Sequence, residues 1–181
     1  VLSSDATRGS TPSHVVADRR RVYGPWARNY TFVSVAGRTS MVALDGTDLT
    51  APDGTRIRRW ERVPAGATDS VLFVHGATYG GRSAFDPEGF SWLEAVAGDG
   101  RAAFAVDVRG YGDSERPPEL DAPADENEPV VRGSTAAMDV AAAVAELRDA
   151  YRSVHLVGYS WGTIIAGLGL AEGRFDVDSL V

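Results

Sequence analysis

Three short apolar runs, each ended by a turn that contains glycine, constrain the fold more than any other feature of the sequence. The runs occupy 71–74, 102–106 and 154–157 and show little polar alternation. Such runs are typical of strands that are covered on both faces. We therefore expect all three to lie in the interior of one sheet.

The segment 134–151 has the periodicity of a helix. Four large side chains recur there at spacings of four, three and four, namely Val140, Val144, Leu147 and Tyr151. This pattern places them on one helix face, and Ser134 or Thr135 is the expected N-cap. Strands that alternate with helices predict an α/β fold, in which a mostly parallel sheet has helices on both faces.

Residues before the first run predict an antiparallel leading edge for this sheet. β-forming residues occupy 30–35, and a second such stretch at 41–44 ends in a turn signal at 45–46. Another turn signal at 51–54 precedes the stretch 56–63, which alternates in polarity. That alternation is typical of a half-buried strand near a sheet edge.

We divide the chain into a polar lead-in segment, 1–28, and a folded domain, 29–181. Within the domain, 113–128 is a proline-rich loop with seven acidic residues and one arginine, which predicts a solvated surface segment. Residues 175–181 have the character of the start of another strand. The domain is therefore expected to be the amino-terminal part of a longer fold, which residues 29–181 alone do not complete.

Composition argues against several function classes. The net charge of −7 argues against a nucleic-acid partner, since phosphate binding needs an excess of Lys and Arg. No apolar run approaches the roughly 18 residues of a membrane span. The sequence has no cysteine, which excludes disulfides and thiolate metal sites. We expect no metal and no cofactor, and a cytoplasmic location with a secreted mature form as the alternative.

The sequence GYSWG at 158–162 fits the pattern G-x-S-x-G, which alone is a weak signal. Its position strengthens it, because it follows one apolar run directly and leads into an apolar helix start at 163–168. A strand, a sharp turn and a helix are the setting of a nucleophile elbow, in which strained backbone exposes the central hydroxyl. We predict Ser160 as the nucleophile and the backbone N–H of Trp161 as an oxyanion donor. The alternative is a helix entry without catalysis.

The other two runs also end in informative turns. In the turn after the first run, we expect the N–H of Ala77 to be a second oxyanion donor and 79–81 to border the site. His75 lies at the strand end, where it is better placed to order this turn than to act as a base. The turn DVRGYGDS after the second run contains Asp107 and Arg109, which we expect to bond backbone groups around the strand exit.

The three motifs HGA, DVRGYGDS and GYSWG, in this order and spacing, resemble the α/β-hydrolase superfamily over about 55–181. Trp161 after the nucleophile is similar to proline iminopeptidase-like members and related esterases. The resemblance implies an α/β-hydrolase fold and cleavage of an ester, amide or related bond of a small-molecule acyl substrate, through an acyl-enzyme on Ser160. Members with Asp at this position include epoxide hydrolases and haloalkane dehalogenases, and Ser160 argues against both chemistries.

A serine hydroxyl needs a base, usually a histidine oriented by a carboxylate. His14 lies in the lead-in, and His155 lies about 13 Å from Ser160 at the usual rise of a strand. In the resembled family the acid and the histidine come later than the nucleophile, so we expect a carboxy-terminal segment or a second chain to supply them. The alternatives are a non-catalytic binding module and a transferase or cyclase that uses the same nucleophile.

The sequence gives little information on the substrate. Tyr79, Tyr159 and Trp92 are candidates for an aromatic pocket, although Trp92 is as consistent with the core. We expect the acidic loop to be remote from the site.

Overall fold

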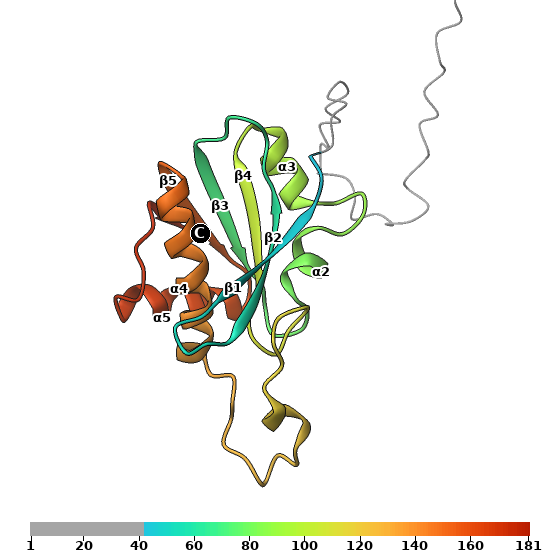
Figure 1. Cartoon of the computed structure of the whole chain (residues 1–181), viewed down its shortest axis with the longest axis vertical. Helices are drawn as coiled ribbons and strands as arrows, with labels where there is room; N and C mark the ends of the chain where they lie inside the picture. Colours follow the sequence, from blue (N-terminus) through green and yellow to red (C-terminus); the bar gives the residue numbers. More distant parts are fainter. Residues whose placement is uncertain (1–41) are drawn as a thin grey trace, which may run out of the picture. The chain divides into compact units, whose positions relative to one another are not determined.

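The three apolar runs form neighbouring parallel strands of one six-stranded sheet (Figure 1). The computed structural model describes residues 42–181. Strand β3 (Asp69–Val74) lies between β4 (Ala102–Asp107) and β5 (Ser153–Gly158), so the chain crosses from one side of β3 to the other between β4 and β5. Five of the six residues in β3 and all six in β4 are buried, as their continuous apolar character predicts.

The predicted antiparallel leading edge is confirmed. Strand β1 (Asp45–Thr50) pairs antiparallel with β2 (Arg56–Arg62), which pairs antiparallel with β4. The turn between β1 and β2 falls at the predicted 51–54, where Gly54 has a φ of 90°. On the opposite side, β6 (Ser179–Leu180) pairs parallel with β5, as expected from the character of 175–181.

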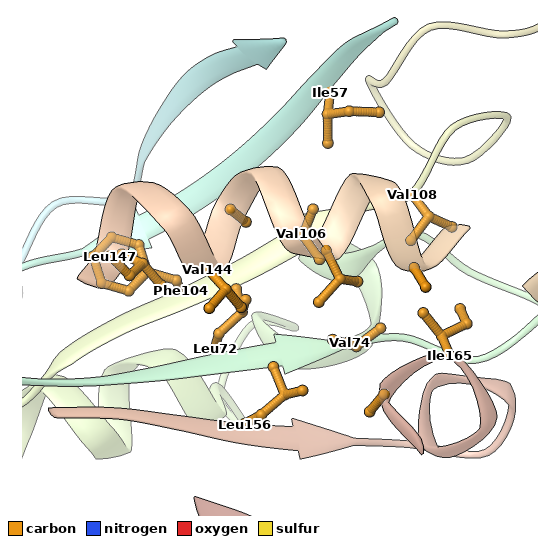
Figure 2. Packing of buried hydrophobic residues seen from close by; sticks show 14 of the residues in the cluster. Ile57, Leu72, Val74, Phe104, Val106, Val108, Val144, Leu147, Leu156 and Ile165 are labelled. Atoms are coloured by element: carbon orange, nitrogen blue, oxygen red, sulfur yellow. The ribbon is translucent and has the colours of Figure 1, made fainter. Parts of the chain in front are cut away.

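Helices cover both faces of the sheet, which confirms the predicted fold class. Helices α4 (Gly133–Ala150) and α5 (Trp161–Ala171) pack on one face, and α2 (Gly81–Phe85) and α3 (Trp92–Gly98) pack on the other (Figure 1). The larger core lies beneath α4 and α5 (Figure 2). There, Val144 and Leu147 of α4 pack towards the strands, as the helical spacing predicts.

Two local predictions are wrong. Residues 45–46 begin β1 instead of forming a turn, because Gly46 pairs with Trp60 of β2. Glycine leaves room for the indole ring of Trp60, since a Cβ on Gly46 would lie 3.0 Å from that ring. Helix α4 begins one residue before Ser134 with Arg132 as the N-cap, and no side chain caps it. The predicted lead-in, 1–28, and the predicted strand at 30–35 lie outside the described residues.

The segment between β4 and α4 contains the acidic loop and a short 3-10 helix, η2 (Pro118–Asp121). It projects from the end of the sheet at which β3 and β4 finish (Figure 1). Most of its side chains are exposed, as expected for a solvated segment. None of the helices in 42–181 combines the length and the apolar character that a bilayer crossing requires.

Candidate active site

The turns after β3, β4 and β5 meet at the carboxyl end of the central strands. Parallel strands end at the same edge, and because β3 lies between β4 and β5 the turns on its two sides lie together there. The backbone N–H of Tyr159 donates to the carbonyl of Val74 at 3.0 Å, and the hydroxyl of Tyr111 donates to the carbonyl of Ala77 at 3.1 Å. The structure therefore brings together the three motifs on which the sequence prediction rests.

Ser160 lies at the tip of the turn between β5 and α5. Its φ of 55° and ψ of −119° lie in the mirror image of the extended region, which glycine adopts freely and other residues do not. No other non-glycine residue in 42–181 has a positive φ. Backbone strain of this kind costs on the order of 1–3 kcal/mol and is concentrated at functional sites.

The strand and the helix on either side of Ser160 approach so closely that larger neighbours would not fit. A Cβ on Gly158 would lie 2.8 Å from the backbone of Thr163, and a Cβ on Gly162 would overlap the carbonyl of Val74. The two glycines of the motif are therefore required by packing, as the sequence predicts.

The hydroxyl of Ser160 is exposed and forms no hydrogen bond with any residue in 42–181. A Cβ on Gly76 would lie 3.0 Å from the Cβ of Ser160, so the turn after β3 runs directly beside the serine. The backbone N–H groups of Ala77 and Trp161 likewise have no acceptor within the described part of the chain. Two free donors and a free hydroxyl thus lie on adjoining turns, an arrangement able to hold an oxyanion.

His75 orders the turn after β3, as its position at the strand end predicts. Its ring is buried, and Nε2 accepts a hydrogen bond from the N–H of Val108 at 3.1 Å. Nδ1 therefore carries the proton and donates to the carbonyl of Gly76 at 2.6 Å. Burial lowers the pKa of His75, although the Gly76 carbonyl and the carboxylate of Asp107 oppose the shift.

His75 should make stability depend on pH. Because its folded pKa lies below its unfolded value of about 6.5, the unfolded chain takes up a proton below that pH and the folded chain does not. The free energy of unfolding should then fall by up to about 1.4 kcal/mol per pH unit as the pH drops below 6.5. His75→Asn should flatten this slope in urea titrations, and His155→Asn should preserve it. An unchanged slope in His75→Asn would contradict the assignment.

Asp107 ties three segments to the exit of β4, which agrees with its predicted structural role. Its carboxylate accepts from the N–H of Gly81 at 2.5 Å, the N–H of Asp113 at 2.9 Å and the indole N–H of Trp60 at 3.0 Å. The role predicted for Arg109 needs correction, because its guanidinium bonds the carboxylates of Asp139 and Asp53 and no backbone group.

Three aromatic residues predicted for a substrate pocket have different surroundings. Tyr79 and Tyr159 are exposed beside the turns that carry Ala77 and Ser160. Trp92 is half exposed at the start of α3, where it packs against Phe73 and Phe85 on the face of the sheet opposite α4. The structure thus separates Trp92 from the other two.

A hollow of about 400 Å³ lies beside the turn after β4. It is lined by Gly110, Tyr111, Arg116, Leu120, Pro129, Val130 and Val131. Tyr111, which also bonds Ala77, lies in the turn just before the acidic segment 113–128. That the acidic segment itself is remote from the site stays a prediction.

Neither histidine among the described residues is free to act as the base for Ser160. His75 is buried with both ring nitrogens bonded, and the ring nitrogens of His155 contact the hydroxyls of Ser153 and Ser179. His14 lies outside the described residues. Residues 42–181 also contain no group of three metal-ligating side chains.

Sequence reasoning missed two residues around the site. One is Tyr111, which stands between two glycines in DVRGYGDS, and such a pair is a signal for an unusual turn. Asp139 looked like an ordinary polar residue of a helix, yet it is fully buried against Arg109. The only sign of this in the sequence is an acidic residue on the helix face that also carries Ala136, Val140 and Ala143.

Comparison with solved structures shows the same fold. An esterase from Pyrococcus furiosus matches at a TM-score of 0.56 and 22% identity, over 76% of this chain and 51% of its own. An epoxide hydrolase from Vigna radiata matches at a TM-score of 0.58 and 23% identity, over 78% of this chain and 40% of its own. An alpha/beta hydrolase from Novosphingobium aromaticivorans matches at a TM-score of 0.56 and 16% identity, over 78% of this chain and 44% of its own.

The chain thus spans about half the length, or less, of these structures. A search of curated proteins found no match. The model of the family described as "Alpha/beta hydrolase family" matches residues 71–181, which is more than half of the chain and includes all three turns of the site. The chain belongs to the alpha/beta hydrolase family.

Proposed function

We propose that this chain carries the nucleophile and the oxyanion donors of a serine hydrolase that cleaves an ester, amide or related acyl bond. The observation that carries the proposal is the strained, exposed backbone of Ser160 at the start of α5, beside the turn that contains Gly76. Such strain persists only where the surrounding structure holds it, and here it presents a free hydroxyl above the sheet.

In the proposed reaction, the Oγ of Ser160 attacks the carbonyl carbon of the substrate while a base takes its proton. The N–H groups of Ala77 and Trp161 donate to the oxygen that becomes negative, and the start of α5 adds the positive end of its dipole. The bond to the leaving group then breaks as that group receives the proton. Water attacks the acyl-enzyme in the same way and releases the acid.

The base and its acidic partner are proposed to come from outside this chain, from a carboxy-terminal segment or a second polypeptide. The described residues support this, because the hydroxyl of Ser160 has no partner among them and both described histidines are engaged elsewhere. The proposal includes no metal and no cofactor, since acyl transfer to water needs neither.

Position 160 also bears on the choice among reactions in this fold. Epoxide hydrolases are among the similar structures, and the members that open epoxides carry Asp at the nucleophile position. A hydroxyl at 160 favours acyl transfer instead. Trp161 supports a proline iminopeptidase-like or esterase-like member, and its side chain packs near Tyr111 with ring centroids 6.0 Å apart.

A fluorophosphonate probe tests the proposal on the full-length protein. We expect one covalent adduct per molecule, mapped by digestion and mass spectrometry to the peptide that contains Ser160. Ser91 and Ser114 in the same digest are internal controls and should stay unlabelled, as should the whole protein after denaturation. No adduct on Ser160 would defeat the proposal and favour a non-catalytic binding module, whereas product analysis would separate hydrolysis from transfer to another acceptor.

A further inference from the structure

We propose that Tyr111 is a positioning residue that holds the two oxyanion donors, Ala77 and Trp161, in place relative to each other. The inference rests on the proposed function, and it assigns a role to a side chain that takes no part in the proposed bond-forming steps. Tyr111 touches no reacting atom in this scheme, so its effect must act through the turns that it contacts.

Tyr111 contacts residues of both turns that carry the proposed oxyanion donors. Its hydroxyl donates to the carbonyl of Ala77 at 3.1 Å. Its ring packs near two others, with its centroid 4.9 Å from that of His75 and 6.0 Å from that of Trp161. One side chain from the turn after β4 therefore joins the turn after β3 to the start of α5.

The bond to Ala77 fixes a donor because of peptide geometry. The peptide between Gly76 and Ala77 is trans, so the N–H of Ala77 points away from the carbonyl of Gly76, which accepts from His75. The next peptide along carries the Ala77 carbonyl, which accepts from Tyr111. With both flanking carbonyls held, the N–H of Ala77 has one direction available to it.

The backbone on both sides of Tyr111 forms a tight turn that fixes the position of this residue. Gly110 and Gly112 have φ values of 81° and 52°, which turn the chain sharply on both sides of Tyr111. A Cβ on Gly112 would overlap the carboxylate of Asp107, so this turn cannot accept another residue there. The N–H of Tyr111 donates to the carbonyl of Val108 at 3.0 Å and completes the turn.

Tyr111→Phe tests the role, because it removes the hydroxyl and keeps the ring. We expect kcat for an activated ester to fall about tenfold with KM within about twofold, since a misplaced donor weakens binding of the transition state and not of the ground state. The inhibition constant of a boronic acid, which mimics the tetrahedral oxyanion, should rise by about the same factor. Rates are taken per active site, titrated with the fluorophosphonate.

Tyr151→Phe is the matched control. Tyr151 is a half-buried tyrosine whose ring packs on Phe104 at the far end of α4, and its hydroxyl makes no hydrogen bond within 42–181. We expect it to retain wild-type kcat and boronic acid affinity. If Tyr111→Phe behaves like this control while Ser160 is labelled, the positioning role is wrong and the proposed function stands. If wild-type Ser160 is not labelled, both proposals fail.

Discussion

Ser160→Gly is expected to abolish hydrolysis and to stabilise the fold, whereas Ser160→Ala is expected to abolish hydrolysis without stabilising it. Both variants lack the proposed nucleophile, so kcat should fall by about 10⁴-fold or more. They differ in backbone strain, because alanine keeps the Cβ that is unfavourable at a φ of 55° and glycine removes it.

The expected stabilisation by glycine is about 1 kcal/mol. Relief of the strained conformation contributes on the order of 1–3 kcal/mol, and the greater freedom of glycine in the unfolded chain offsets about 0.5–1 kcal/mol of it. Little packing is lost, since Ser160 is exposed. A site that favours function over stability shows this trade-off when its strained residue is replaced.

Urea denaturation of the wild type and both variants, with ester hydrolysis measured on the same samples, checks this prediction. The midpoint should rise in Ser160→Gly and stay near the wild-type value in Ser160→Ala. Equal stability of the two variants would show that the turn stores no strain. Activity retained in Ser160→Ala would show that another residue is the nucleophile.

The parallel alignment of the central strands, though not their order, could be predicted from the sequence because it depends on short-range signals. Each of β3, β4 and β5 is an apolar run with a glycine turn after it, and parallel strands must bring those turns to one edge. The shared edge of parallel strands is enough to predict that Ala77 and Ser160 lie on neighbouring turns, whatever the rest of the fold. The helical periodicity of α4 was visible for the same reason.

Features that depend on contacts between distant segments could not be predicted. The start of β1 depends on how Gly46 fits against Trp60, a residue fourteen positions later that local turn signals do not reveal. The role of Tyr111 depends on the meeting of three turns from separate parts of the chain. The partners of Arg109 come from a turn and a helix, Asp53 and Asp139, and neither is marked in the sequence.

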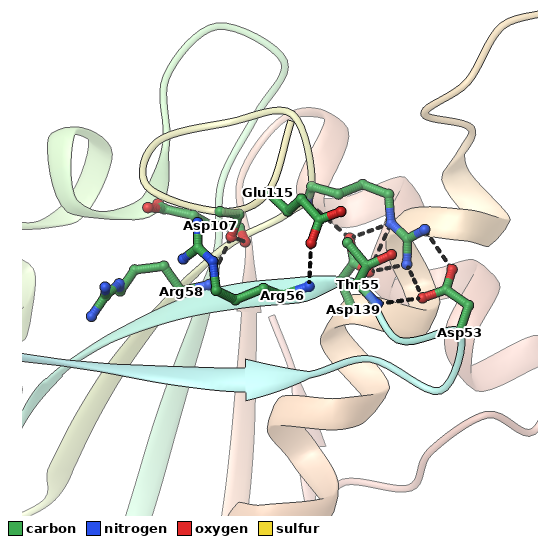
Figure 3. Close-up of polar contacts among 9 residues, drawn as sticks. Asp53, Thr55, Arg56, Arg58, Asp107, Glu115 and Asp139 are labelled. Atoms are coloured by element: carbon green, nitrogen blue, oxygen red, sulfur yellow. Dashed lines mark hydrogen bonds and ion pairs between the residues drawn. The ribbon is translucent and has the colours of Figure 1, made fainter. Parts of the chain in front are cut away.

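Arg109→Met is expected to destabilise the fold by about 3–5 kcal/mol, because it leaves the carboxylate of Asp139 buried without a counter-charge. The side chain of Asp139 is 0% exposed, and that of Arg109 is 7% exposed. Arg109 donates to Asp139 from Nη2 at 2.6 Å and from its backbone N–H at 2.9 Å, and it reaches Asp53 from Nη1 at 2.6 Å (Figure 3). Arg116→Met, which breaks an exposed pair with Asp121, should cost less than about 1 kcal/mol.

A second substitution separates the buried charge from the lost contacts. In Arg109→Met with Asp139→Asn, the amide oxygen at 139 can still accept from the backbone N–H of residue 109, but no charge is buried. This double variant should regain at least about 2 kcal/mol of the loss, measured by urea denaturation at pH 8. If the double variant is no more stable than Arg109→Met alone, packing by the arginine stem, and not the unpaired carboxylate, dominates the loss.

The pH dependence of the single variant gives an independent measure of the same charge. Burial raises the pKa of Asp139 even though hydrogen bonds from Arg109 oppose the rise, so removal of the arginine should raise this pKa further. The folded Arg109→Met chain would then bind a proton more readily than the unfolded chain, and its deficit relative to wild type should shrink as the pH falls from 8 to 5. A stability deficit of Arg109→Met that is constant over this range would mean that Asp139 has another counter-charge in the variant, and would contradict the role given to Arg109.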